Sequence, residues 1–261
     1  MIQRIHKVDK DIEGKILTVL AVFFPVSEII KQILLTVTYG QYQWWYFPFQ
    51  LCSMPIYFLP LYVCLKNKQG RWGGDWVDGH MKSQLAPLSS SRGQSFSKVL
   101  AAYLADFGLL GGIFAFADQS GMHYELPILT VHSYIWHILM VVMALLIWRN
   151  ETRSFSEPDK FSESGTFSVR NLPGTIALFG LTAAVATCFN LAFHPYGIIN
   201  MFYISPHYKM TQVVFSDIAD LLGDGAGHLI YLISIAVGGC LIHMLLGAAS
   251  KVSSGICRNR R

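Results

Sequence analysis

Six apolar runs, each close to 20 residues long, constrain this chain more than any other feature of its sequence. They lie at about 15–38, 44–65, 97–117, 126–148, 173–194 and 226–249. A helix of about 20 apolar residues is long enough to cross the hydrocarbon core of a bilayer. None of the runs alternates between apolar and polar residues as the strands of a membrane barrel do. The sequence therefore predicts an all-α bundle of six transmembrane helices, with residues 1–261 forming a single multi-pass membrane domain.

The overall composition agrees with this prediction. Hydrophobic residues make up 52% of the 261 residues and charged residues only 14%, whereas ordinary globular domains carry roughly 25% charged residues. The 22 glycines and 10 prolines are scattered along the chain, and no repeat of fixed period is visible. Disordered, collagen-like and coiled-coil structures are therefore excluded.

The basic residues indicate an orientation in the membrane. All but two of the 20 Lys and Arg residues lie at the two termini, between the second and third runs, or between the fourth and fifth. The exceptions are Lys31, inside the first run, and Lys209, in the long connection before the last run. Cytoplasmic loops carry the excess of Lys and Arg, so we expect an integral cell-membrane protein with both termini in the cytoplasm. We interpret the net charge of +4 as a sign of this orientation and not of nucleic-acid binding, so no nucleic-acid partner is predicted.

The connecting segments differ in character. Segments 66–96 and 149–172 are rich in Ser, Gly and charged residues and are predicted to be cytoplasmic connectors. The external connection 195–225 instead contains an apolar, aromatic stretch at 198–203, which exposed loops rarely carry. We expect this stretch to lie against the bundle or to re-enter it. Residues 1–14 have mixed charge and precede a run too long for a signal peptide, so a retained first helix is predicted.

Polar and ionisable residues within the runs are the candidates for function, because each of them costs free energy inside a bilayer. Most of them fall in the predicted outer half of the bundle, and these are Glu28, Lys31, Gln32, Gln50, Cys52, His132, His137, Asn190, His194 and His228, joined by Asn200 and His207 of the external connection. Only Asp106, near the middle, and His243, in the inner half, lie apart. Glu28 and Lys31 are three residues apart and are expected to pair on one helix face. The alternative for the whole cluster is a set of ordinary interhelical hydrogen bonds.

The second run is unusually rich in proline, with Pro48, Pro55 and Pro60 on either side of Cys52. Each proline removes an intrahelical hydrogen bond and kinks the axis. We expect free carbonyls around Cys52, as in broken helices that line a cavity. A simply kinked packing helix is the alternative.

A thiol within reach of an imidazole can ionise and act as a nucleophile. The predicted depth of Cys52 in the membrane is close to the predicted depths of His132 and His137 in the fourth run. These histidines are five residues apart, which places them about 140° apart around an ideal helix, so both face one site only if the helix bends or the site is wide. The same spacing disfavours a metal site. No metal and no cofactor are predicted, and the five cysteines show no disulfide framework.

Three short motifs carry a resemblance to a known family. They are Pro48-Phe49-Gln50-Leu51-Cys52, the pair His132 and His137 in the fourth run, and the stretch from Asn200 to Pro206. In these motifs the chain resembles the YwaF-like integral membrane family, which shares its motif with eukaryotic transmembrane protein 164. The order and spacing of the motifs match over most of the chain. The family's usual pattern at the first motif is Pro-Leu-His-Leu-Cys, so Gln50 stands where the family often has His.

The resemblance implies a membrane protein of six or seven helices. For the eukaryotic relative it further implies acyl transfer between phospholipids through a cysteine that carries the acyl group. Carried over to this chain, Cys52 is the nucleophile and His132 or His137 is the base. Gln50 removes one candidate base or orienting group.

Two hypotheses of different classes follow. In the first, the protein is an acyltransferase or acyl hydrolase that acts on membrane lipid in the outer half of the bilayer, with Cys52 attacking an ester carbonyl. Asn190 or Asn200 then donates to the oxyanion, and Glu28 and Gln50 bind or orient the substrate. In the second hypothesis, the outer polar cluster binds or transports a small ligand or a proton without catalysis. The lack of a visible inverted repeat argues against a secondary transporter, and a scaffold for another membrane protein is a third possibility.

Overall fold

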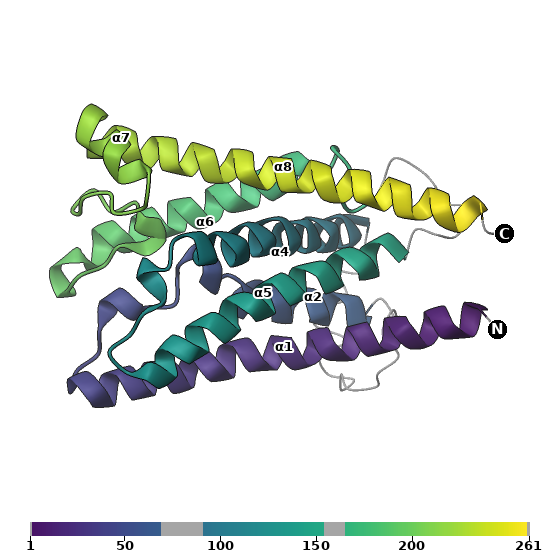
Figure 1. Ribbon diagram of the computed structural model, residues 1–261, viewed down its shortest axis with the longest axis horizontal. Helices are drawn as coiled ribbons and strands as arrows, with labels where there is room; N and C mark the ends of the chain where they lie inside the picture. Colours follow the sequence, from purple (N-terminus) through teal and green to yellow (C-terminus); the bar gives the residue numbers. More distant parts are fainter. Residues whose placement is uncertain (1, 69–90, 154–164, 260–261) are drawn as a thin grey trace.

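The computed structural model describes residues 2–68, 91–153 and 165–259, and this part of the chain is helical with no strand (Figure 1). The long helices are α1 (Ile2–Tyr39), α2 (Pro55–Lys68), α4 (Ser91–Ala117), α5 (Pro127–Arg153), α6 (Leu172–Phe193) and α8 (Asp224–Asn259). They run along the length of the molecule. The short helix α7 (Phe215–Leu222) packs against α8 at one end.

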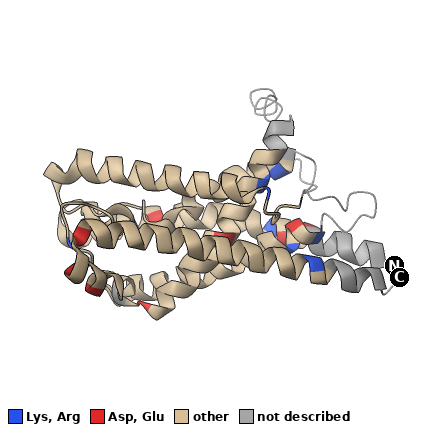
Figure 2. Ribbon diagram, turned by 90° about the horizontal axis from the view of Figure 1, so that it is seen from above, with Lys and Arg blue, Asp and Glu red and all other residues tan. Residues whose placement is uncertain are grey.

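Both termini lie at the same end of the bundle. Most of the described Lys and Arg residues also gather there (Figure 2). We call this end the inner end and the opposite end the outer end, after the predicted orientation. Most of the two predicted cytoplasmic connectors falls in 69–90 and 154–164, which are outside the described residues.

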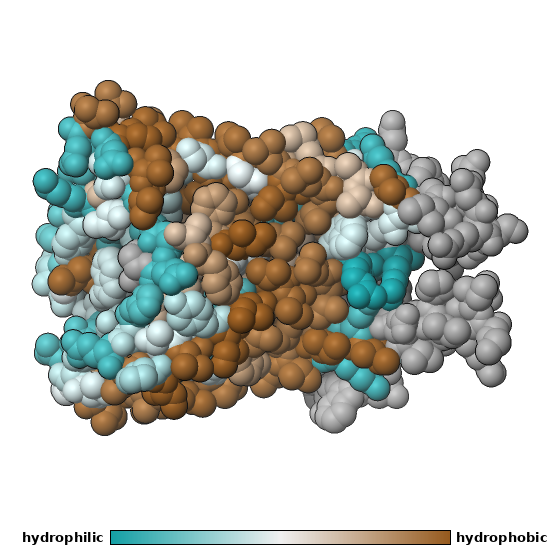
Figure 3. Space-filling model, in the orientation of Figure 1, coloured by the Kyte–Doolittle hydropathy of each residue, from teal (hydrophilic) through white to brown (hydrophobic). Residues whose placement is uncertain are grey.

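Five helical segments of the described chain are long and apolar enough to cross a membrane. They are Asp11–Tyr39, Ser95–Ala117, Pro127–Arg153, Leu172–Tyr196 and Asp224–Ser253. On the face shown in Figure 3, apolar side chains form a broad belt across the middle of the molecule, between more polar ends. A multi-pass helical membrane protein accounts for this surface, because side chains that face lipid tails need not be polar.

The second apolar run differs from its prediction. Instead of one helix over 44–65, the chain forms two 3-10 turns, Trp44–Tyr46 and Leu51–Ser53, before α2 begins at Pro55. The 14 residues of α2 span about 21 Å at 1.5 Å per residue, which is short of a hydrocarbon core of about 30 Å. A count of six transmembrane helices is therefore not confirmed. The physical reason is proline, which starts a helix readily but lacks the N–H group needed to continue one.

The central helix α4 packs against α2, α5, α6 and α8. Its closest approach to α5 depends on Gly112. A Cβ atom at this position would lie 2.7 Å from a methyl group of Val141 and 3.2 Å from the carbonyl oxygen of His137. Glycine therefore lets the α5 backbone come close at the level of the candidate histidines.

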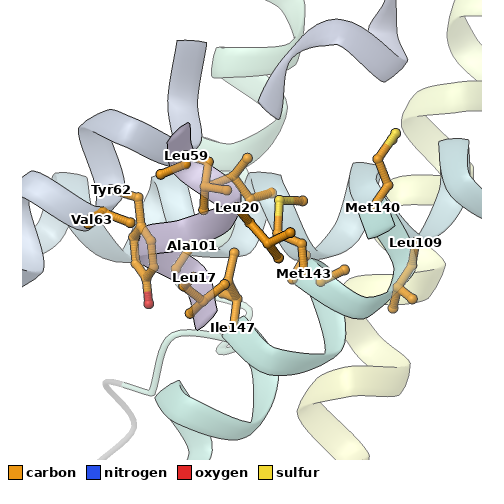
Figure 4. Close-up of a cluster of buried hydrophobic side chains, with 14 of the residues drawn as sticks. Leu17, Leu20, Leu59, Tyr62, Val63, Ala101, Leu109, Met140, Met143 and Ile147 are labelled. Carbon is orange, nitrogen blue, oxygen red and sulfur yellow. The ribbon is translucent and has the colours of Figure 1, made fainter. Parts of the chain in front are cut away.

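Two buried hydrophobic clusters fill the bundle. The first joins α1, α2, α4 and α5 (Figure 4), and its members include Leu17, Leu59, Ala101, Met140 and Ile147. The second joins α4 and α6 to the external stretch 199–204. This second cluster confirms that the apolar external stretch lies against the bundle.

Candidate functional site

The predicted pair on the first helix forms and is part of a larger network. Lys31 Nζ lies 2.8 Å from Glu28 Oε1, and Glu28 is only 4% exposed. Gln32 Nε2 donates to Glu28 Oε1 at 2.6 Å and to the carbonyl oxygen of Tyr46, also at 2.6 Å. The polar face of α1 is thus tied to the first 3-10 turn, and the Glu28 charge is balanced by a neighbouring cation.

Cys52 lies in the second 3-10 turn, Leu51–Ser53, just before α2. Its carbonyl oxygen accepts a hydrogen bond of 3.1 Å from the indole Nε1 of Trp136 in α5. This is the free carbonyl expected near the prolines, because the irregular backbone leaves it without a helical partner. Cys52 is half-buried against the first hydrophobic cluster, and the charges of Lys31 and Glu28 act on its thiol.

Trp136 connects this turn to the candidate histidine one helical turn away. Its ring centroid lies 5.5 Å from that of His132 and 4.7 Å from that of Phe24. Lys31, Glu28 and His137 all act electrostatically on His132. Trp136 therefore lies between the Cys52 backbone and His132, and the paired charges of Glu28 and Lys31 act on both sites.

The structure distinguishes two histidines that the sequence left equivalent. His137 Nδ1 lies 2.8 Å from the carbonyl oxygen of Ser133, and a carbonyl only accepts, so this nitrogen carries a proton. His132 Nε2 is buried and has no hydrogen-bond partner among the described residues. Buried polar atoms are normally paired, so His132 is the one of these two histidines with a fully buried nitrogen that lacks a partner.

Gln50, Asn190 and Asn200 hold the external stretch in place. The Gln50 amide donates to the carbonyl oxygen of Asn200 at 2.9 Å and accepts from the N–H of Phe202 at 2.7 Å. The Asn190 amide donates to the carbonyl oxygen of Met201 at 3.0 Å and accepts from its N–H at 2.6 Å. Asn200 Oδ1 accepts from the N–H of Ser205 at 2.8 Å. These three side chains therefore stabilise the external stretch, because buried backbone groups outside a helix need hydrogen-bond partners.

The clamped stretch has an unusual backbone. Phe202 and Tyr203 both have a φ of 58°, in the left-handed region that favours glycine. Each such residue costs on the order of 1–2 kcal/mol. The hydrogen bonds of the Gln50 and Asn190 amides offset this cost, and Gln50 ties the stretch to the chain just before the turn that contains Cys52.

Two tyrosines that the sequence analysis did not select, Tyr124 and Tyr203, lie in the connections between helices at the outer end. Burial raises the pKa of Tyr203, and nearby Cys52, Tyr124 and Asp118 raise it further. Burial likewise raises the pKa of Tyr124, followed by the effects of Glu28, Cys52 and Tyr39. The sequence analysis selected polar residues inside the apolar runs. These two tyrosines lie in the connections between runs, where aromatic residues are common at a membrane interface.

A second buried polar group consists of Asp106 and His243. Both residues were expected to lie apart from the outer polar residues. Asp106 of α4 and His243 of α8 form a pair, with Oδ2 and Nδ1 2.8 Å apart. His243 Nε2 lies 3.1 Å from the carbonyl oxygen of Ser168 and must donate to it. A proton is therefore shared between Nδ1 and the carboxylate, while Asp106 Oδ1 has no partner among the described residues.

A small cavity lies between the start of α2 and helices α4 and α5, and Cys52 is not among its lining residues. The cavity has a volume of about 10 Å³, and its apolar lining includes Leu51, Met54, Tyr103 and Phe107. A space of this size holds about one water molecule. Within the described ranges, no group of three or more His, Cys, Asp or Glu side chains is placed to hold a metal ion.

The apolar belt, the long helices and the buried polar clusters define a polytopic helical membrane protein. The chain belongs to the TMEM164 family, whose family model matches residues 1–247. This match confirms the resemblance to transmembrane protein 164. No curated protein and no solved structure matches the chain.

Proposed function

We propose that the protein is a membrane-embedded acyltransferase or acyl hydrolase that acts on lipid through Cys52. The observation that carries the proposal is the unpartnered, buried Nε2 of His132. Its ring packs on Trp136, and the same Trp136 holds the backbone of Cys52. An imidazole nitrogen without a partner is free to accept a proton, as a general base must. His132 is therefore our candidate for the base, and His137 for a positioning residue.

The proposed reaction has two steps. His132 Nε2 takes the proton from the Cys52 thiol, and the thiolate sulfur attacks the carbonyl carbon of a lipid ester, forming a C–S bond. The ester C–O bond then breaks, and the leaving alcohol takes the proton from His132. In the second step a hydroxyl group attacks the thioester, His132 accepts its proton, the C–S bond breaks, and the proton returns to Cys52. Water as the second nucleophile gives a hydrolase, and a lipid hydroxyl gives an acyltransferase.

The local electrostatics support this chemistry. Lys31 and Glu28 together add no net charge near Cys52, so the pair orders the site without repelling a neutral ester. We further propose that the outer end faces the outer half of the bilayer, with cytoplasmic termini. Membrane lipid then reaches Cys52 from the side of the bundle.

The experiment is labelling of the full-length protein in membranes with a thiol-reactive lipid analogue. Wild type, Cys52→Ala, His132→Gln and the control Cys188→Ala are compared, because Cys188 is an exposed cysteine of α6. We expect no specific labelling in Cys52→Ala, a loss of about 100-fold in His132→Gln, and no change in Cys188→Ala. Equal labelling of wild type and Cys52→Ala would contradict the proposal.

The buried pair of Asp106 and His243 favours a second candidate, a ligand-binding or transport protein without catalysis. Ionisable pairs inside a membrane bundle commonly mark proton or ion pathways. In that case Cys52→Ala is silent, whereas Glu28→Gln and Asp106→Asn change ligand or proton movement. The labelling experiment separates the two candidates, because only the first requires a reactive Cys52.

A further inference from the structure

The short helix α7 in the external connection has two chemically different sides. Successive residues of a helix are rotated by about 100°. The polar side chains of α7 therefore fall within a sector of about 100°, and they are Ser216, Asp217 and Asp220. The remaining residues are apolar and fill the opposite sector, and they are Phe215, Ile218, Ala219, Leu221 and Leu222. A helix of this kind places its apolar side against another element or against lipid.

Helix α8 covers only part of the apolar side of α7. Ala219 is buried, and a Cβ atom on Gly227 of α8 would lie 2.6 Å from its Cβ atom. The two helices are therefore in close contact at this point. Leu221 and Leu222, in contrast, are 83% and 65% exposed. Their side chains extend beyond the contact with α8.

Two more exposed apolar side chains directly precede α7. Val213 and Val214 are 59% and 60% exposed. Val214 also has a φ of 71°, in the left-handed region of the backbone. A β-branched residue is an outlier at positive φ, whereas Gly or Asn adopts this conformation at lower cost. An exposed valine at such a position fits apolar surroundings better than it fits water.

The uncovered side of α7 adjoins a surface of the lipid-facing kind. Helix α8 follows α7 after the single residue Gly223. Along α8, every fourth residue over four positions is apolar and more than half exposed, and these residues are Leu229, Ile233, Val237 and Leu241. On a membrane-spanning helix such a row contacts lipid tails. At the outer end α7 lies beside α8 (Figure 1), and apolar surface at this corner continues into the belt (Figure 3).

We propose that α7 is an interfacial helix, whose uncovered apolar side contacts the bilayer at the outer end through Val213, Val214, Leu221 and Leu222. The eight residues of α7 span about 12 Å, so the helix lies along the membrane surface and does not cross it. Interfacial helices bury their apolar side about 5–10 Å into the boundary between headgroups and acyl chains and keep their polar side in water. Contact between α7 and lipid does not depend on any reaction of Cys52.

The test introduces a photoreactive benzophenone amino acid, one position at a time, into the full-length protein in phosphatidylcholine vesicles. The test positions are Leu221 and Val213, which lie toward the two ends of α7. Ile233 of α8, which is 53% exposed, is the positive control. Asp220, an exposed residue on the polar side of α7, is the matched negative control. After illumination, mass spectrometry separates adducts with lipid from adducts with protein.

We expect lipid adducts at Leu221 and at Val213 with yields within about threefold of that at Ile233 and about tenfold above that at Asp220. Lipid adducts at Ile233 but not at the two test positions would overturn the proposal, because lipid then surrounds α8 without reaching α7. Adducts at only one test position would contradict a helix that lies along the surface. A crosslinked dimer in place of lipid adducts would also overturn it, since a second copy of the chain would then cover this side.

Discussion

Two buried polar clusters lie at opposite ends of the bundle, and they differ in how completely their atoms are paired. At the inner end, Glu151 Oε1 lies 2.5 Å from Lys66 Nζ and accepts from the Tyr62 hydroxyl at 2.8 Å. Glu151 Oε2 accepts from Thr166 at 2.7 Å. At the outer end, His132 Nε2 has no partner within the described chain.

The backbone differs in the same way. Lys66 and Glu151 lie on the regular helices α2 and α5, whereas Cys52 lies in a 3-10 turn and Tyr203 in a left-handed stretch. A fully paired cluster on regular helices stabilises a fold. Unpaired atoms and strained backbone cost free energy, and proteins retain them mainly at functional sites. The comparison therefore favours a stabilising role for the inner cluster and supports the proposed chemistry at the outer one.

The largest effect is expected from breaking the inner cluster. Glu151→Ala leaves the buried ammonium group of Lys66 without its main partner, which typically costs about 3–5 kcal/mol. Thermal unfolding in detergent should show this loss. Replacing both members of the pair, as Lys66→Met with Glu151→Leu, should restore most of the stability. A stable single variant would contradict the structural role of this cluster.

A smaller effect on stability is expected from removing hydrogen bonds of the external clamp. By this name we mean the bonds that the Gln50 and Asn190 amides make to the backbone of residues 200–202. Asn190→Ala removes the partners of both backbone groups of Met201, at a cost of about 2–4 kcal/mol. Because the same stretch is bonded to Gln50, two residues before Cys52, acylation of Cys52 should also slow down. Limited proteolysis of the outer end would report the loosened stretch. Asn190→Asp keeps the acceptor for the Met201 N–H and should retain part of the protection, so equal protection in all three proteins would argue against the clamp.

The smallest effect is expected at Trp136. Trp136→Phe keeps an aromatic ring against Phe24 but removes the hydrogen bond to the Cys52 carbonyl oxygen, worth about 1 kcal/mol. We expect a nearly normal unfolding temperature and a several-fold slower labelling of Cys52. Trp148→Phe is the matched control, because the Trp148 indole bonds Leu246 and Ser250 at the other end of α5. Slower labelling in the control as well would show that the effect is not local to Cys52.

The sequence predicted the helical bundle well, because long apolar runs have few alternatives to membrane helices. It also predicted the pair of Glu28 and Lys31, since a spacing of three residues on a helix determines proximity. It did not predict the broken second run as two 3-10 turns and a short helix. Composition alone made that run look like a full span, although its prolines marked the place where the helix fails.

The contacts of the outer site depend on tertiary structure, and sequence spacing does not encode them. The bonds of Gln50 to Asn200 and Phe202 join residues 150 and 152 positions apart, and the pair of Asp106 and His243 is separated by 137 positions. The difference between His132 and His137 arises from a single backbone hydrogen bond, which no residue pattern reveals.

The central claim is that Cys52 carries an acyl group during the reaction. Mass spectrometry of the protein purified from lipid membranes tests this claim most directly, by searching for an acyl thioester on the peptide that contains Cys52. We predict a hydroxylamine-sensitive acyl group on Cys52 in wild type, with strongly reduced occupancy in His132→Gln. Complete absence of an acyl group on Cys52 after incubation with lipid ester, in a protein that is folded, would contradict the account.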